Sequence, residues 1–237
     1  MRFAIKVPTA PVYRRMQLAP VVTARAQLAT RPPWIAIFAK AYALVAHEMP
    51  ELRRTYLSYP WPHLYEWPVS VAAIAVEREY QGEPAAFGCI VPDPRALSLT
   101  EIGQKVAHAA QAPIDEIPEF RRAVRGGRLP LPLRRLLMWL CFNIGAQRAQ
   151  YVGTYAVTTL AALGADSPLL RSVWTVALVY GPLEPDGSMN VGITTDHRVL
   201  DGAFSARALA RIEETLNGAI ADELRGSVPE SRRRLTA

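Results

Sequence analysis

The chain has 237 residues, of which 50% are hydrophobic and 20% are charged, and its formal net charge is +6. This composition predicts one folded domain with a buried core and excludes a disordered tail protein. No stretch reaches the roughly 18 uninterrupted apolar residues that cross a bilayer. The N-terminus also lacks an apolar run followed by a small-residue cleavage site, so we expect a cytoplasmic protein.

Arginine supplies most of the basic charge, because only three of the 27 basic side chains are lysines. A basic chain suits acidic partners such as phosphates, nucleic acid, an acidic carrier protein or anionic lipid. Composition does not choose among them. The two cysteines, Cys89 and Cys141, fit no metal-ligand or redox pattern, so we expect buried thiols without a chemical role and no metal site.

Prolines punctuate the start of the chain. Because proline lacks a backbone donor and disfavours helix before it, residues 1–33 are predicted to form an extended arm. The main domain then covers residues 34–225, and a basic tail covers 226–237. Apolar residues spaced three or four apart predict a helix from Trp34 to Glu48, closed by Met49-Pro50.

Strand and helix patterns alternate through the rest of the chain. Ser98-Leu99-Thr100-Glu101 has the form of a capping box and predicts a helix to about Ala110. A second helix is predicted from Ala203 to Glu223. We expect the late strands to be antiparallel and the fold class to be α/β or α+β, a mixed β-sheet with helices packed on it. The predicted strands are Val69–Glu77, Phe87–Val91, Gly153–Leu160, Ser172–Tyr180 and Met189–Thr195, with turns at Gln81–Pro84 and Glu184–Gly187.

The middle of the chain combines basic and apolar residues. Six arginines without an acidic residue among them are followed by the apolar run Leu136–Phe142. We favour a surface loop that leads into a core helix; the alternatives are binding of phosphate or an acidic partner, and contact with a membrane surface. The pattern leaves open whether Leu129–Ile144 lines a substrate tunnel, packs internally or touches lipid. The arginines are Arg121, Arg122, Arg125, Arg128, Arg134 and Arg135.

One histidine follows a predicted strand directly. His197 begins a turn that leads into a helix, and strand ends commonly expose catalytic groups. An imidazole with a pKa near 6.5 is the usual general base, so we predict that His197 is catalytic. Asp201 would hold the turn through an arginine or backbone amides, and Gly202 would supply a conformation that a side chain forbids. The remaining histidines, His47, His63 and His108, have no such context.

Residues Asp196–Gly202 resemble the His-x-x-x-Asp-Gly signature of the chloramphenicol acetyltransferase superfamily, in the form found in dihydrolipoyl acyltransferase catalytic domains of 2-oxoacid dehydrogenase complexes. Further matches follow in family order from about residue 34 to 222. The resemblance implies a chloramphenicol acetyltransferase-like two-layer fold, with residues 34–225 as the acyltransferase catalytic domain. The matching segments are the helix ending His47–Leu52, the strand Cys89–Pro92, the helix start Leu97–Ile102 and the strand Gly153–Leu160.

What the resemblance implies is acyl transfer from a thioester to a thiol, hydroxyl or amine. His197 would deprotonate the acceptor, and Thr158, by position, would donate its hydroxyl to the oxyanion, an interaction worth ~10²–10³ in rate. Adjacent strand residues point to opposite faces, so only one of Thr158 and Thr159 can face the site, and we assign Thr158. The resemblance implies that no cofactor is bound. It also implies acyl-CoA or acyl-carrier protein as the co-substrate, and a homotrimer with active sites between subunits.

Departures from the family pattern shape the functional hypothesis. Ala161 stands where the family has glycine, and Asp166-Ser167-Pro168 replaces an Asn-Pro-Pro-like element. Because no lipoyl domain precedes the core, we expect the acyl group to arrive from outside. We favour a stand-alone acyltransferase with a CoA or carrier-protein thioester as donor, a small or lipidic acceptor, and arginines available for the donor's phosphates.

Two other functions are retained as alternatives. The first is a core subunit of a 2-oxoacid dehydrogenase complex whose lipoyl domain lies on another chain. The second is a non-catalytic oligomeric scaffold, although a scaffold has no reason to retain an ionisable base beside a turn. Nucleic-acid binding ranks lowest, because no recognition motif surrounds the arginines.

Overall fold

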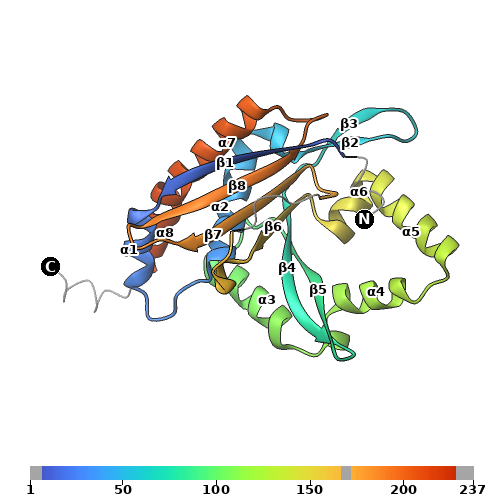
Figure 1. The fold of residues 1–237 in the computed structure, drawn as a ribbon, viewed down its shortest axis with the longest axis horizontal. Helices are drawn as coiled ribbons and strands as arrows, with labels where there is room; N and C mark the ends of the chain where they lie inside the picture. The colour runs from blue at the N-terminus through green and yellow to red at the C-terminus, as the bar shows by residue number, and fades with distance from the viewer. Residues whose placement is uncertain (1–6, 167–171, 228–237) are drawn as a thin grey trace.

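The computed structural model describes residues 7–166 and 172–227, and Figure 1 shows how helices pack on a mixed sheet. In the described part of the chain, the main sheet has six strands in the order β1-β8-β7-β6-β4-β5, and β2 and β3 form a separate hairpin. The predicted fold class is therefore confirmed. Residues 1–6 of the expected arm, Ser167 and Pro168 of the departing element, and residues 228–237 of the tail lie outside the described residues.

Both strand directions occur in the main sheet. The pairs β1/β8, β7/β8 and β4/β5 are antiparallel, whereas β4/β6 and β6/β7 are parallel. The expectation of antiparallel late strands is thus right for β7/β8 and wrong for β6/β7, because the sequence between Thr159 and Val176 is long enough for the crossover that a parallel pair requires. The strands are β1 (Thr9–Gln17), β4 (Val71–Tyr80), β5 (Glu83–Pro92), β6 (Tyr155–Thr159), β7 (Val176–Leu183) and β8 (Ser188–Asp196).

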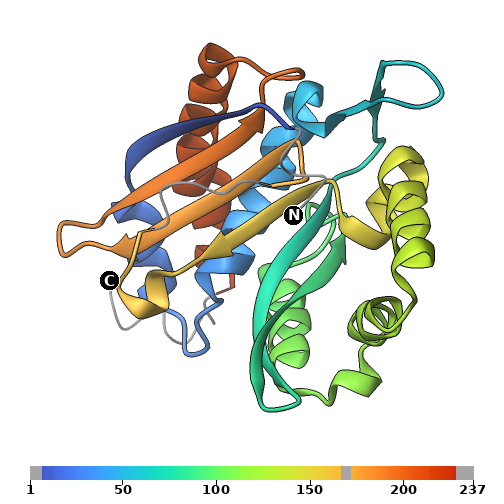
Figure 2. The ribbon, with the colours of Figure 1, turned by 45° about the vertical axis from the view of Figure 1, so that its right-hand side comes forward.

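Helices α1, α2, α7 and α8 lie on one side of strands β1, β8, β7 and β6 (Figure 2). Short 3-10 turns occur at Pro50–Arg53, Ile114–Glu116 and Ala161–Leu163, and a π-helical segment at Leu216–Ile220 joins the last two helices. The α-helices are α1 (Ala19–Ala26), α2 (Trp34–Glu48), α3 (Leu99–Gln111), α4 (Pro118–Gly127), α5 (Leu131–Asn143), α6 (Gly145–Val152), α7 (Gly202–Thr215) and α8 (Ala221–Gly226).

The core forms where α2 packs on the sheet. Phe38 stacks on Tyr180 of β7 with ring centroids 4.4 Å apart, and Tyr42 stacks on Tyr155 of β6 at 4.0 Å. The Tyr155 hydroxyl donates to the carbonyl of Ala39 at 2.7 Å, so this buried polar group is satisfied. Side chains on the same face of β6 as Tyr155 therefore point toward the helices.

Helix boundaries agree closely with the sequence patterns. Helix α2 has the predicted bounds, and α3 begins with the predicted capping box: the Ser98 hydroxyl accepts from the Glu101 amide, and the Glu101 carboxylate accepts from the Ser98 amide at 2.7 Å. The predicted helix Ala203–Glu223 is helical throughout, with the π-helical segment inside it.

The expectation of an extended N-terminal arm is wrong between Ala19 and Ala26. Helix α1 occupies these residues, because Pro20 lies in its first turn, where the missing backbone donor costs nothing. Its Val21 and Ala24 are buried in the core. Strand β1 is extended as expected, but it pairs with β8 along its whole length. The described part of this segment is thus integral to the fold.

The favoured interpretation of the basic and apolar segment is also wrong. Instead of a loop and a core helix, the segment forms α4 and α5, and α5 buries none of its residues because it packs mainly on the neighbouring α6. Cys141 on α5 is half-exposed rather than buried. Cys89 on β5 is buried as expected, and burial raises the pKa of its thiol to about 11.

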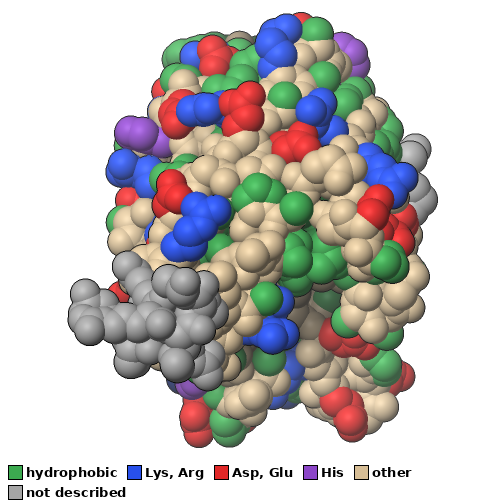
Figure 3. Space-filling view, turned by 90° about the vertical axis from the view of Figure 1, so that its left-hand side faces the viewer, with side chains coloured by type: hydrophobic (Ala, Val, Ile, Leu, Met, Phe, Trp, Pro, Cys, Tyr) green, Lys and Arg blue, Asp and Glu red, His purple; other side chains and the backbone are tan. Residues whose placement is uncertain are grey.

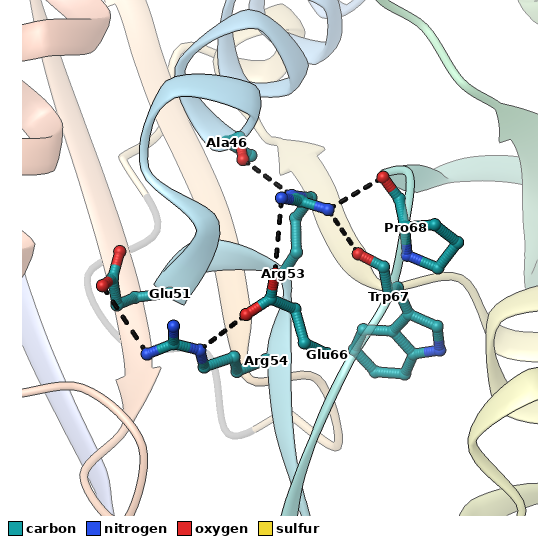
Figure 4. A network of polar contacts seen from close by, with 7 residues as sticks. All are labelled: Ala46, Glu51, Arg53, Arg54, Glu66, Trp67 and Pro68. Atoms are coloured by element: carbon teal, nitrogen blue, oxygen red, sulfur yellow. Dashed lines mark hydrogen bonds and ion pairs between the residues drawn. The ribbon is translucent and has the colours of Figure 1, made fainter.

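A hairpin made of β2 (Arg54–Leu57) and β3 (His63–Glu66) projects from the end of α2. Figure 4 shows the contacts that hold its base. The Arg53 guanidinium donates to the carbonyls of Ala46 at 2.9 Å and Pro68 at 2.8 Å, and Arg54 pairs with Glu66 at 2.9 Å. The hairpin is therefore tied to α2 and to the chain that enters β4.

Candidate active site

The end of β8 presents His197 to solvent. Asp196, the last residue of the strand, is 4% exposed, whereas His197 is exposed. The His197 amide donates to the carbonyl of Pro8 at 2.8 Å, just before β1 begins. The sheet thus ends at a residue whose backbone is fixed and whose ring can meet a substrate.

Asp196 organises the turn that carries His197. Its carboxylate accepts from the Arg198 amide at 3.0 Å and from the Arg198 guanidinium at 2.9 Å and 2.6 Å. This hydrogen bonding is the main cause that raises the pKa of Arg198. The guanidinium also lies over the ring of Tyr56, 4.3 Å from its centroid. The residues on both sides of His197 are therefore held together by a fork-shaped ion pair.

Asp201 holds the other end of the turn. Its carboxylate accepts from the Phe204 amide at 2.6 Å, which makes it the N-cap of α7. Asp201 was expected to hold the turn through an arginine or through backbone amides. The structure shows the bond to a backbone amide, and the guanidinium of Arg198 bonds to Asp196 instead. The expectation for Gly202 is wrong: its φ is not positive, and a Cβ there would meet nothing within 4 Å. Gly202 begins a helix with ordinary geometry.

The two candidate hydroxyls lie on opposite faces of β6. The Thr159 hydroxyl donates to the Tyr180 carbonyl at 2.7 Å and accepts from the Ala161 amide at 3.0 Å. Thr159 shares the helix-covered face with Tyr155, and its hydroxyl is already engaged in hydrogen bonds within the protein. Thr158 points to the other face, is half-buried, and its hydroxyl has no hydrogen-bond partner among residues 7–166 and 172–227.

A single chain does not bring Thr158 and His197 together. Thr158 pairs with Val179 on β7, and Val179 pairs with Gly192 on β8. His197 lies five residues beyond Gly192, which is about 16 Å along the strand, and two strand spacings add about 10 Å across the sheet. The predicted base and the predicted oxyanion donor are therefore far apart within one protomer.

A cavity of about 290 Å³ lies near the strand partners of Thr158. Val179 and Gly192 both line it, and the amide of Asn190 donates to the Asp166 carboxylate at 3.2 Å at its edge. Two glycines leave room for the side chains that line the cavity. A Cβ at Gly181 would collide with Asp166, and a Cβ at Gly192 would collide with Tyr13. The remaining lining residues are Tyr13, Tyr180 and Gly181.

Arg148 is a charged residue near the turn that the sequence patterns did not single out. It lies on α6 with 7% exposure, and burial lowers the pKa of its guanidinium to about 10, while the negative charge of Asp196 opposes that shift. One guanidinium nitrogen donates to the Val173 carbonyl, and Nε is buried with no hydrogen-bond partner in the described part of the chain. Its only sequence signal is a lone arginine in a short, mostly uncharged segment.

The other histidines lie elsewhere. His47 lies in the last turn of α2, His108 lies in the last turn of α3, and the His63 ring contacts the carbonyl of Trp61 at 2.7 Å. Among the described residues, no group of three or more His, Cys, Asp or Glu side chains is arranged to hold a metal ion. All six arginines of the basic segment are exposed on or just after α4 and on α5, so their contact with donor phosphates stays a prediction.

Comparison with known proteins identifies the architecture. No protein-family model and no curated protein matches the chain. Solved structures do match. Dihydrolipoamide acetyltransferase of Azotobacter vinelandii is 18% identical over 93% of this chain and 86% of its own, with a TM-score of 0.65. The cubic core of a pyruvate dehydrogenase complex is 17% identical over 93% and 86%, with a TM-score of 0.61.

A chloramphenicol acetyltransferase also matches, at 14% identity over 94% of this chain and 92% of its own, with a TM-score of 0.56. Identities this low establish the three-dimensional arrangement rather than the chemistry. The matches nevertheless cover nearly all of each chain, so they concern the whole domain. The chain therefore has the fold shared by chloramphenicol acetyltransferase and the dihydrolipoamide acetyltransferase catalytic domains.

Proposed function

We propose that this protein is an acyltransferase that moves an acyl group from a CoA or carrier-protein thioester to a small or lipidic acceptor. The observation that carries the proposal is the exposed imidazole of His197 on a turn held by Asp196, Arg198 and Asp201. A base presented on a rigid strand end can receive a proton without reorganisation.

The reaction would proceed by direct attack. An imidazole nitrogen of His197 takes the proton of the acceptor thiol, hydroxyl or amine, and the acceptor heteroatom bonds to the thioester carbonyl carbon. The Thr158 hydroxyl donates to the resulting oxyanion, which suits a hydroxyl that has no hydrogen-bond partner among the described residues. The intermediate then collapses, the carbon–sulfur bond breaks, and the imidazolium returns the proton to the departing thiolate.

The separation within one chain supports a site built from two copies. Thr158 of one protomer would face His197 of the next, as expected for the homotrimer that the family resemblance implies. The fold match to the core of a multienzyme complex agrees with an assembly of this kind. The matched Azotobacter enzyme was studied for the catalytic role of a serine, a histidine and an asparagine four positions after the histidine, the same spacing as His197 and Asp201.

The core of a 2-oxoacid dehydrogenase complex is the second candidate, since one of the matched structures is the cubic core of a pyruvate dehydrogenase complex. Supplying acylated lipoyl domains and acyl-CoAs as alternative donors separates the two. Turnover with the lipoyl domains alone favours the complex subunit, and turnover with acyl-CoAs alone favours the stand-alone enzyme.

Loss of thioester with several acyl-CoAs and a small thiol tests the proposal directly. His197→Ala is expected to lower the rate by ~10²–10⁴, whereas His47→Ala, a matched change of an exposed histidine on α2, leaves it unchanged. Mixing His197→Ala and Thr158→Ala protomers should restore about a quarter of wild-type activity, because random assembly reunites the intact residues at that fraction of interfaces. Equal activity of wild type and His197→Ala would refute the proposal.

A further inference from the structure

Helix α5 exposes apolar side chains on all sides. Leu131, Leu133, Leu136, Leu137, Met138 and Trp139 are each between 37% and 53% exposed, and the helix has no buried residue. Contiguous apolar side chains that a protein leaves exposed are normally covered by a protein partner or by lipid. Within the described part of the chain, α5 has no such cover, unlike α2, which buries ten of its residues.

The tip of the β2–β3 hairpin extends the same surface. Tyr59 and Trp61 are 54% and 66% exposed, and the Tyr59 ring meets the Trp139 ring edge to face at 5.0 Å. Ser58 and Asn143 are also linked, by a hydrogen bond of 3.2 Å. These two contacts join the hairpin tip to α5 in one continuous surface, which we call the α5–hairpin surface.

The charge beside this surface is entirely positive over a long stretch. From Phe120 to Ala165 the sequence has seven arginines and no acidic residue. Of the six that are exposed around α4 and α5, Arg122 has an ion pair among the described residues, with Glu119 at 3.7 Å. The opposite end of the molecule differs, since acidic and basic side chains are interspersed there (Figure 3).

These features favour an anionic lipid surface over a second copy of the chain. Two copies that met here would bring like charges together, whereas phosphate headgroups would neutralise them. Leucines with interfacial tryptophan and tyrosine, beside basic residues, are typical of helices that lie in the plane of a membrane surface. Prolines at 60, 62, 130 and 132 also remove backbone donors that would otherwise need a partner in the apolar region.

We propose that the α5–hairpin surface and the arginines of α4 dock on an anionic bilayer, with α5 in the interfacial region and the arginines at the headgroups. None of the helices in the described ranges is long and apolar enough to cross a membrane, so the contact is peripheral. Tyr56 of the same hairpin lies under Arg198, which places the turn of His197 beside the docked face.

Vesicle binding by the full chain tests this without any assay of activity. We expect co-sedimentation with vesicles of phosphatidylcholine and phosphatidylglycerol, weak binding to phosphatidylcholine alone, and release by salt. Because each basic side chain near such a surface contributes severalfold to partitioning, Arg121→Glu with Arg125→Glu should lower binding by about tenfold or more. Leu136→Gln with Leu137→Gln should lower it similarly, by removing buried apolar area.

Matched controls are Arg31→Glu and Leu163→Gln, which change an exposed arginine and an exposed leucine elsewhere, and both should bind as wild type does. Circular dichroism confirms that each variant is folded. No binding to the anionic vesicles, or unchanged binding of the α4 and α5 variants, would overturn the proposal. So would an oligomer in sedimentation velocity that the Leu136 and Leu137 changes dissociate, because a second copy would then occupy the surface.

Discussion

Asp196 and Arg198 close the turn around His197 through three side-chain hydrogen bonds and one from the Arg198 amide. The carboxylate is almost fully buried, while the guanidinium is about one-third exposed on its outer side. The arginine thus satisfies a buried charge and orients the catalytic candidate between the two residues.

Removal of Arg198 should therefore affect both stability and activity. Arg198→Ala leaves the Asp196 carboxylate buried without its main partner, and we expect a loss of about 2 kcal/mol in the free energy of unfolding. Arg198→Lys keeps the charge but not the fork geometry, so its effect should be smaller. Urea denaturation measures the change in stability, and thioester turnover measures the change in activity. Wild-type stability of Arg198→Ala would contradict this account.

The two adjacent threonines should respond differently to truncation. Thr158→Ala is expected to lower turnover by ~10²–10³ with little change in stability, because its hydroxyl has no partner within the described chain. Thr159→Ala removes hydrogen bonds to Tyr180 and Ala161 and should cost about 1 kcal/mol of stability with a smaller change in turnover. Steady-state rates and denaturation curves distinguish the two, and a reversed pattern would assign the oxyanion role to Thr159.

Gly153 should not tolerate a side chain. Its φ of 83° and ψ of 168° lie in a region that is essentially restricted to glycine, and a Cβ would lie 3.0 Å from that of Ala73. Gly153→Ala is expected to cost about 2 kcal/mol of stability. Gly126→Ala on α4 is the control, because a Cβ there meets nothing within 4 Å and alanine favours helix. Thermal unfolding of both variants provides the measurement.

The capping box of α3 predicts a pH-dependent contribution to stability. Hydrogen bonds from the Ser98 amide and hydroxyl lower the pKa of Glu101 from 4.5. A carboxyl group whose folded pKa is lowered stabilises the protein above its unfolded pKa and loses that effect as the pH falls through the folded value. Glu101→Ala should therefore be less stable than wild type at pH 7, and the difference should shrink below pH 4.5. A constant difference across this range would argue against the carboxylate's role.

Local patterns determined the elements whose signals lie within a few residues. The apolar spacing from Trp34 to Glu48 placed α2, and Ser98 with Glu101 placed the start of α3, because each depends on contacts between neighbours in sequence. The strand end at Asp196 and the turn that follows are local in the same sense. These signals were enough to predict the mixed sheet and to single out His197.

Tertiary structure decided everything that depends on which residues meet across the chain. Proline content alone could not reveal that β1 pairs with β8, and apolar content alone could not reveal that α5 remains uncovered, since burial depends on where the rest of the chain packs. The engagement of Thr159 and the distance from Thr158 to His197 follow from strand register in the same way. The sequence thus identified the chemical groups of the candidate site. The fold determined how far apart they lie, because distance in space is set by side-chain packing and strand pairing rather than by order along the chain.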